Sequence, residues 1–391
     1  MASPTYRRQV CLAAAAAAFA ALYMYVAHSL AIIGFGKTYA SVNATSCRQV
    51  GRGMLQGCED IVVDPHTGLA YLACGNLAAR QRWIFPNEAH DASLHAGADH
   101  VYVMDERDAV ADIRLLEPAA DGGLVPFSQT IRLHGFDIYW EPKDPRRMTF
   151  MFVNHQLDRA AVSIFSHTSG ADHMVHEETV WSELLWSPNN IVAMSKHSFY
   201  ATNDMKYNHG VLRELSSTLR LPGGHVVYRN DLGAFSIAAS HIRFPNGIAK
   251  YRDWIYVVAS GDPGVHIYQA GAAGRLEYTG RVVYSDSVPD NIFVDPANGQ
   301  IYSASFLKVL EMYKYFKHPS LATTQAAGTK VVRLTQRSNP SHGFDIESLL
   351  IDSGELMPTA TIAALQRRNQ VKRLLIGCVM CDSVSVCDAV A

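Results

Sequence analysis

Residues 59–74 read EDIVVDPHTGLAYLAC, and the fold prediction rests on this stretch. A polar pair opens it, an apolar run follows, and the turn sequence DPHTG at residues 64–68 leads into a second apolar run. Turns that combine Asp, Pro and Gly are typical of hairpin connections between β-strands. The stretch therefore predicts two short antiparallel strands, with the polar pair at the start of the first.

Three further stretches repeat this unit. Residues 189–204 read NNIVAMSKHSFYATND, residues 245–260 read PNGIAKYRDWIYVVAS, and residues 290–305 read DNIFVDPANGQIYSAS. They start about 45–57 residues apart, a period that is typical of β-propeller blades. A fifth unit fits residues 134–155, and a weaker sixth unit fits residues 358–380.

The six units predict an all-β fold, a six-bladed β-propeller that comprises residues 37–391. We expect the C-terminal strand near Leu374 to close the ring beside the N-terminal segment 36–57. Residues 316–341 are rich in Thr, Ala, Gln and Ser, and we expect them to form a surface connection. The formal net charge of -2 offers no basic excess for phosphates, so nucleic acid is not an expected partner.

From Val10 to Ala27 the sequence VCLAAAAAAFAALYMYVA contains no charged residue. A helix of this length can span a bilayer. Two arginines precede it, so the positive-inside rule places the rest of the chain in the secretory lumen or outside the cell. We expect residues 1–36 to form the transmembrane signal anchor of a type II membrane protein. The alternative is a cleaved signal peptide, which would leave a secreted protein.

Six cysteines follow the apolar segment, an even number that is typical of disulfide-bonded exported proteins. They are Cys47, Cys58, Cys74, Cys378, Cys381 and Cys387. A disulfide between the two ends of the chain would stabilise the fold by about 4–5 kcal/mol in the chain-entropy model. The pairing of the four inner cysteines stays open. The sequon at Asn43 predicts a glycosylation site just outside the membrane.

Carboxylates and amides open the repeated units. They are Glu59, Asp60, Asn189, Asn190, Asn246, Asp290 and Asn291. In a propeller the starts of the inner strands meet at one end of the central channel, so these side chains should converge. They are hard oxygen donors, which Ca²⁺ prefers. Capping of turns is the commonest role of a single such residue, but recurrence in four units favours a calcium site.

Several shorter motifs accompany these units in a fixed order. They are His134-Gly135, Val153-Asn154-His155, FYATND ending at Asp204, and LLIG ending at Gly377. In this order and at these spacings, over residues 47–387, the sequence resembles the paraoxonases and related calcium-dependent arylesterases and lactonases. The resemblance implies a six-bladed propeller that holds two calcium ions in its central tunnel.

The resemblance also implies the ligands of each ion. The catalytic calcium would be bound by Glu59, Asn189, Asn246, Asp290 and Asn291. The structural calcium would be bound by Asp60, the backbone carbonyl of Phe136, and residue 190. Family members similar to the animal enzymes have Asp at that last position, whereas this chain has Asn190, and the loss of a carboxylate weakens a calcium site. A disulfide between Cys47 and Cys387 is implied as well.

Two histidines complete the implied site. His134 would be the general base and His155 the second member of a histidine dyad. Histidine titrates near neutral pH and can take a proton from an attacking water. Asp204 is a weaker candidate partner, because the family's histidine after it is Met205 here. The expected reaction is hydrolysis of aryl esters or lactones, in which calcium stabilises the oxyanion.

Other functions stay open at this point. A propeller enzyme similar to gluconolactonases or strictosidine synthase would use related metal ligands. A non-catalytic, calcium-stabilised propeller anchored in a membrane would bind a lipid or a protein. No G-x-S-x-G nucleophile elbow occurs in the sequence, which disfavours a serine hydrolase. Aromatic residues in two loops are candidates either for an apolar pocket or for packing, namely Trp83, Phe85, Tyr207 and Tyr228.

Overall fold

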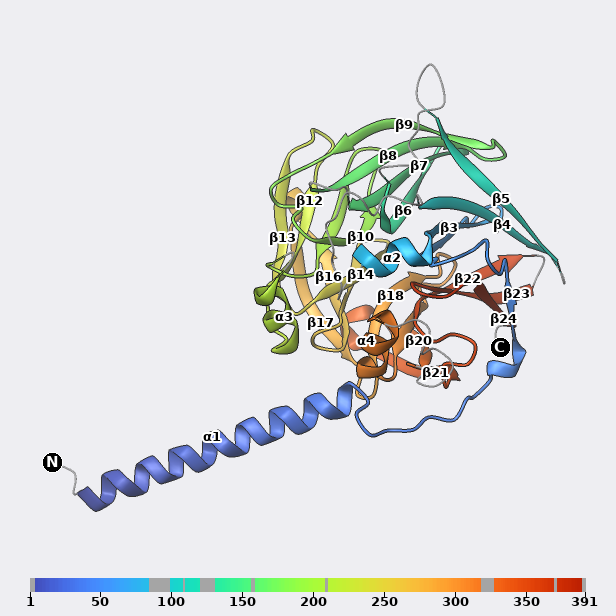
Figure 1. Cartoon of the computed structure of the whole chain (residues 1–391). Helices are drawn as coiled ribbons and strands as arrows, with labels where there is room; N and C mark the ends of the chain where they lie inside the picture. The colour runs from blue at the N-terminus through green and yellow to red at the C-terminus, as the bar shows by residue number, and fades with distance from the viewer. Residues whose placement is uncertain are drawn as a thin grey trace.

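The computed structural model describes residues 4–83, 99–107, 110–119, 131–155, 159–207, 210–317, 327–368 and 371–388. Within these ranges the chain forms six blades of four antiparallel strands that surround a central axis (Figure 1). The first two blades are joined into one eight-stranded sheet, because their outer strands β5 (Val110–Ala119) and β9 (His173–Val180) pair in parallel. The first strand of each blade contacts the first strands of the two neighbouring blades, and these six inner strands line the tunnel. The six-bladed propeller that the repeated units predict is therefore confirmed.

The first three blades follow one another along the chain. Blade 1 consists of β2 (Asp60–Val63), β3 (Ala70–Cys74), β4 (His100–Arg107) and β5 (Val110–Ala119). Blade 2 consists of β6 (Leu133–Glu141), β7 (Asp144–His155), β8 (Ala160–Thr168) and β9 (His173–Val180). Blade 3 consists of β10 (Pro188–Ala193), β11 (Phe199–Asn203), β12 (Gly224–Arg229) and β13 (Phe235–Ile242).

The remaining blades complete the ring. Blade 4 consists of β14 (Pro245–Tyr251), β15 (Trp254–Ala259), β16 (Gly264–Ala270) and β17 (Leu276–Val283). Blade 5 consists of β18 (Val288–Val294), β19 (Ile301–Phe306), β20 (Thr329–Gln336) and β21 (Phe344–Asp352). Blade 6 consists of β22 (Ala360–Arg368), β23 (Val371–Cys378), β24 (Val384–Asp388) and β1 (Cys47–Val50). The expected surface connection at 316–341 is wrong over β20, because its apolar side chains Val331, Val332 and Leu334 are buried in the core.

Strands from both ends of the chain close the ring in blade 6. β1 pairs with β24, with Cys47 opposite Cys387, and a disulfide joins these two residues. Buried Glu106 of β4 also forms an ion pair with Arg48 of β1, which connects blade 6 to blade 1. The strand that contains Leu374 is β23, and it lies one position further from the N-terminal segment than expected. The disulfide that the resemblance implies is thus present.

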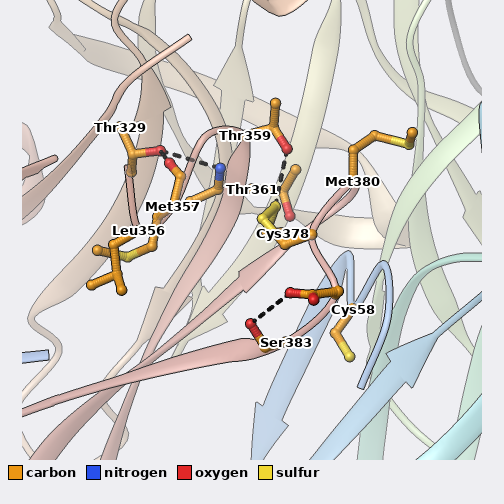
Figure 2. Close-up of a disulfide and its surroundings, with 12 residues drawn as sticks. Cys58, Thr329, Leu356, Met357, Thr359, Thr361, Cys378, Met380 and Ser383 are labelled. Carbon is orange, nitrogen blue, oxygen red and sulfur yellow. Dashed lines mark hydrogen bonds between the residues drawn. A yellow bond between two sulfur atoms is a disulfide. The ribbon is translucent and has the colours of Figure 1, made fainter. Parts of the chain in front are cut away.

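The four inner cysteines form two local disulfides. Cys58 is joined to Cys74, and Cys378 is joined to Cys381. The hydroxyl group of Thr359 lies 3.0 Å from Sγ of Cys378 (Figure 2). These bonds settle the pairing that the sequence leaves open and fasten the loops beside β2 and β23.

Apolar side chains fill the spaces between the blades. Between blades 1 and 2, Tyr71 packs edge-on against Phe150 at a ring-centroid distance of 5.1 Å. The rings of Phe136, Phe150 and Phe152 are nearly parallel and contact one another, with centroids 5.2 Å to 6.5 Å apart. Successive side chains of a strand point to opposite faces of the blade, so each face contributes alternate residues to the interface with the next blade. The core is therefore a series of interfaces around the tunnel, which keeps the polar tunnel residues in place.

Helices lie outside the blades. They are α1 (Pro4–Ile32), α2 (Leu77–Trp83), α3 (Val211–Thr218) and α4 (Val309–Lys317). Residues Arg8–Ile32 of α1 are long and apolar enough to cross a membrane, and α1 extends away from the propeller (Figure 1). The residue after α1 contacts the start of α4, because the carbonyl of Ile33 accepts a hydrogen bond of 3.0 Å from the amide of Val309.

Candidate active site

The inner strands interrupt their regular pairing at equivalent places. The register shifts between Leu133 and Phe136 in β6, Pro188 and Ile191 in β10, Pro245 and Ile248 in β14, Pro289 and Ile292 in β18, and Ala360 and Ile362 in β22. Bulges of this kind redirect side chains and are common beside functional sites. The residues inside these bulges include His134, Asn246 and the polar pairs at 189–190 and 290–291 that the sequence singles out, whereas β2 pairs with β3 without a register shift.

Two glycines allow neighbouring inner strands to approach closely. A Cβ atom on Gly135 would lie 2.3 Å from Cγ of Asn190. A Cβ atom on Gly247 would lie 2.6 Å from Cα of Asn291. Both distances are too short for any side chain, so the absence of a Cβ atom brings the polar residues of adjacent blades into contact.

A cavity of about 1120 Å³ opens at this end of the tunnel. Polar residues from the strand ends line it, namely Glu59, His134, His155, Asn189, Asn246, Asp290 and Thr361. Other lining residues come from α3, α4, the end of α1 and the segments beside the inner strands. Many of them are apolar, including Trp186, Met205, Phe244, Phe306 and Leu310. An apolar cavity with a few convergent polar groups is typical of a small-molecule site.

Three buried oxygen atoms at this cavity have no hydrogen-bond partner in the described part of the chain. They are Oε2 of Glu59, Oδ1 of Asn189 and Oδ1 of Asn246. The buried carboxyl group of Asp290 lines the same cavity. We call these four residues the first tunnel position. Buried polar atoms are nearly always paired, and an unpaired one costs about 1–3 kcal/mol, so oxygens gathered here indicate a place for a cation.

The charges at the first tunnel position support a cation. Burial raises the pKa of Glu59, and the neighbouring carboxylate of Asp290 raises it further. Burial also raises the pKa of Asp290. A bound cation would favour the ionised form of both groups. No group of three or more His, Cys, Asp or Glu suited to a metal occurs among the described residues, so the fit rests on two carboxylates with amide oxygens, a set that suits Ca²⁺.

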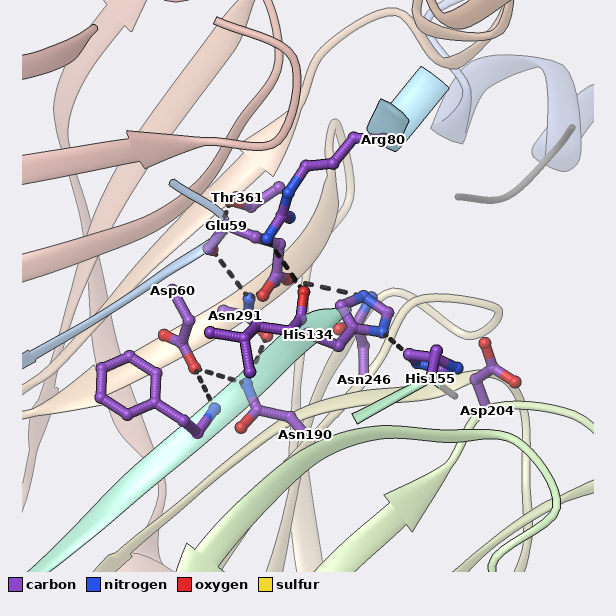
Figure 3. A network of polar contacts seen from close by, with 12 residues as sticks. Glu59, Asp60, Arg80, His134, His155, Asn190, Asp204, Asn246, Asn291 and Thr361 are labelled. Carbon is purple, nitrogen blue, oxygen red and sulfur yellow. Dashed lines mark hydrogen bonds and ion pairs between the residues drawn. The ribbon is translucent and has the colours of Figure 1, made fainter. Parts of the chain in front are cut away.

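The second tunnel position consists of Asp60, Phe136 and Asn190, and its two polar side chains are hydrogen-bonded to each other (Figure 3). Oδ1 of Asp60 accepts a hydrogen bond of 2.9 Å from the amide of Ile61. Oδ2 of Asp60 accepts one of 3.2 Å from the amide of Phe136 and one of 3.1 Å from Nδ2 of Asn190. Burial, and then the nearby Glu59 carboxylate, raise the pKa of Asp60.

Asn291 connects the two tunnel positions. Its Oδ1 accepts a hydrogen bond of 2.8 Å from Nδ2 of Asn190, and its Nδ2 donates one of 2.7 Å to Oε1 of Glu59. One oxygen of Glu59 is therefore held by an amide, while the other is the unpaired Oε2. The chain of contacts runs from Asp60 through Asn190 and Asn291 to Glu59.

The two predicted histidines are in direct contact. Nδ1 of His134 lies 3.0 Å from Nε2 of His155, and Nε2 of His134 lies 3.8 Å from Oε1 of Glu59. Burial lowers the pKa of His134 well below its usual value, and His155 and the cations Arg80 and Arg213 add to this effect. His134 is therefore held as a neutral imidazole, the form that accepts a proton.

A buried ion pair fixes the backbone next to His134. Nη2 of Arg80, on α2, lies 3.1 Å from Oδ2 of Asp99. The same Nη2 donates to the carbonyl of Leu133 at 2.9 Å, and Oδ2 of Asp99 accepts from the amide of Leu133 at 2.7 Å. Arg80 was not predicted, because nothing in the segment LAARQRW distinguishes it from a surface arginine.

Asp204, the weaker candidate, forms a two-fold ion pair with Arg213 of α3. Its two carboxylate oxygens accept hydrogen bonds of 3.1 Å and 2.9 Å from the guanidinium group. Both residues line the cavity. Arg213 was not predicted, since α3 carries no sequence motif. Thr361, whose hydroxyl donates to the carbonyl of Glu59 at 2.7 Å, could have been found as the equivalent residue in the sixth unit.

The loop aromatics that were candidates for an apolar pocket do not line the cavity, as far as the structure describes them. Tyr228 packs against Tyr200 within blade 3, with ring centroids 4.7 Å apart. Neither Tyr207 nor Tyr228 lines the cavity, so the pocket alternative is wrong for both. Phe85 lies outside the described residues. Trp186, which the sequence did not single out, supplies aromatic surface to the cavity instead.

Together, the fold and the cavity define a six-bladed propeller with a small-molecule site at one end of its tunnel. The sequence model of one family, described as arylesterase, matches residues 92–388. Because this match covers most of the chain, the protein belongs to the arylesterase family.

Individual relatives share about a quarter of the residues. Serum paraoxonase/arylesterase 1 of Rattus norvegicus is 24% identical over 340 residues, which are 86% of this chain and 87% of the rat protein. Serum paraoxonase/lactonase 3 of Oryctolagus cuniculus is 25% identical over 327 residues, 83% of this chain and 84% of the rabbit protein. A solved luciferin-regenerating enzyme is similar with a TM-score of 0.51 and 13% identity, over 90% of this chain and 96% of that chain. This last likeness concerns the fold alone.

Proposed function

We propose that the protein hydrolyses carboxylic esters, either aryl esters or lactones, in the cavity at the end of the tunnel. The observation that carries this proposal is the placement of three unpaired buried oxygens beside the contacting pair of His134 and His155. The names of the rat and rabbit relatives, arylesterase and lactonase, support both substrate classes. The apolar cavity wall suits the aryl or acyl part of such a substrate.

The first tunnel position would hold a calcium ion, with Glu59, Asn189, Asn246 and Asp290 as its ligands. Asn291, the fifth ligand that the resemblance implies, has its Oδ1 bonded to Asn190 and its Nδ2 bonded to Glu59, so it supports the ligand Glu59 instead. Bound calcium supplies a Lewis acid that stabilises the negative charge developing on the carbonyl oxygen. The hydrogen bond from Asn291 orients the carboxylate of Glu59, so that its Oε2 stays available to the ion.

His134 acts as the general base in this proposal. With a proton on Nδ1 donated to Nε2 of His155, the lone pair of His134 lies on Nε2, beside Glu59. His134 takes a proton there from the attacking water and returns it to the leaving oxygen as the ester C–O bond breaks. The products are an acid and an alcohol, or one hydroxy acid from a lactone.

The test is hydrolysis by the full-length chain purified in mild detergent. Phenyl acetate and a medium-chain δ-lactone are the substrates, before and after EGTA and again after calcium is restored. EGTA should abolish activity, calcium should restore it, and His134→Gln should lower kcat by about 100-fold or more. His66→Gln, in the exposed β2–β3 turn, is the matched control and should change nothing. No hydrolysis by the folded, calcium-loaded protein would favour the non-catalytic binding propeller.

We also propose that α1 anchors the protein as a type II membrane protein. The span Arg8–Ile32 and the three disulfides in the propeller support export with a retained helix. Nη2 of Arg220 donates 2.8 Å to Oγ of Ser29, so the helix end is held against the cavity wall. Retention in the membrane pellet after carbonate extraction, with an intact N-terminus, is the expected result. Asn43 stays a predicted glycosylation site in this orientation.

A further inference from the structure

We propose that the second tunnel position holds no ion, and that the side-chain amide of Asn190 takes the place of one. The inference concerns the tunnel beyond the cavity lining and does not depend on which ester is the substrate. It rests on the direction in which each polar atom at this position points.

The amide nitrogen of Asn190 lies between two oxygens. Nδ2 donates to Oδ2 of Asp60 at 3.1 Å and to Oδ1 of Asn291 at 2.8 Å. A calcium ion binds where several oxygens point toward one place. Here Oδ2 of Asp60, from blade 1, and Oδ1 of Asn291, from blade 5, both accept from the side-chain amide of Asn190 in blade 3, which takes the place of a positive centre.

The orientation of this amide is fixed by its other end. Oδ1 of Asn190 accepts a hydrogen bond of 2.7 Å from the amide of Ile191. If the amide were turned over, Oδ1 would face the oxygens of Asp60 and Asn291, and Nδ2 would face a backbone N–H. All of these contacts would then be repulsive, so Asn190 presents nitrogen rather than oxygen to the tunnel.

The carboxylate of Asp60 is also engaged. It accepts hydrogen bonds from the amides of Ile61 and Phe136 as well as from Asn190, so both of its oxygens have donors. The side chains of Asp60, Phe136 and Asn190 are buried. Gly135 packs closely against Asn190, which restricts the movement of its side-chain amide.

The charge balance agrees with this arrangement. Asp at position 190 would make four buried carboxylates with Glu59, Asp60 and Asp290, enough to balance two divalent ions. With Asn190 there are three, one fewer than two divalent ions would need.

The experiment counts bound calcium on the full-length chain in detergent. Equilibrium dialysis followed by elemental analysis should find one ion per molecule in the natural protein and two in Asn190→Asp. Asn190→Asp should also show a larger rise of Tm on addition of calcium. Asn298→Asp, which adds the same charge in an exposed turn, is the control and should bind one ion.

Two ions in the natural protein, falling to one in Asn190→Ala, would overturn the inference and leave the proposed hydrolysis intact. No ion in the natural protein but one in Asn190→Asp would support the inference and contradict the proposed calcium site at the first tunnel position. The experiment can therefore contradict the inference about the second tunnel position without contradicting the calcium site at the first, and the reverse.

Discussion

The two tunnel positions are built from the same residue types, often from consecutive residues, yet their hydrogen bonding is opposite. Asn189 has an unpaired Oδ1, whereas every polar atom of the Asn190 side chain is bonded. Glu59 and Asp60 differ in the same way, since Oε2 of Glu59 has no partner and both oxygens of Asp60 have donors. Successive residues in an extended strand point to opposite sides, so neighbours in sequence enter different environments.

This difference shows that the residue type alone does not identify a metal position. An amide or carboxylate is a ligand only where no protein donor has already taken its oxygen. A buried oxygen without a donor costs about 1–3 kcal/mol, and three of them in one place are consistent with selection for a bound cation. A fully bonded group instead joins blades to one another.

The largest expected effect comes from replacing a carboxylate by an amide at each of the two tunnel positions. Glu59→Gln should lower kcat/KM for phenyl acetate by about 1,000-fold or more, because a lost metal ligand costs several kcal/mol of transition-state stabilisation. Asp60→Asn should lower kcat/KM far less, and its effect should appear as a lower Tm, since its amide would oppose a backbone N–H donor. Equal losses of kcat/KM in the two variants would contradict the distinction.

A smaller test uses the two glycines that bring the strands together. Gly135→Ala and Gly247→Ala should each destabilise the fold by about 1–3 kcal/mol, because a Cβ atom overlaps a neighbouring strand. Only Gly247→Ala, beside Asn246, should also weaken calcium binding. Denaturant unfolding and calcium titration measure the two effects. Gly271→Ala, in a surface turn where the nearest atom to a Cβ would be 3.2 Å away, is the control.

The blade pattern was predictable because it is local. Each hairpin, such as EDIVVDPHTGLAYLAC, carries its own strands and turn, and repetition at a regular period indicates the ring. The composition of blade 6 was less accessible, because β1 and β24 come from opposite ends of the chain and only the folded ring shows which strand is their neighbour. The local disulfides Cys58–Cys74 and Cys378–Cys381 were undetermined for another reason, since four cysteines allow three pairings and spacing alone does not choose between them.

The sequence predicted which residues meet at the site but did not predict their hydrogen-bond partners. Glu59, Asn189, Asn246 and Asp290 meet at one cavity, as their places in the repeated units predict. The donor set of Asn190 and Asn291 depends on contacts between blades 1, 3 and 5, which no local pattern records. Arg80 and Arg213 belong to short helices outside the repeats, so their approach to His134 follows only from the fold.

The smallest test concerns the hydroxyl of Thr361, which supports the first tunnel position from blade 6. Thr361→Val keeps the shape of the side chain but removes the hydrogen bond of 2.7 Å to the carbonyl of Glu59. We expect a loss of about 1 kcal/mol in unfolding free energy and a calcium affinity that is weaker by a few-fold. Thr361→Ser retains the hydroxyl and should restore both values. Unchanged calcium affinity in Thr361→Val would show that Asn291 alone positions Glu59, and that the first tunnel position depends on blade 5 rather than on the closing blade.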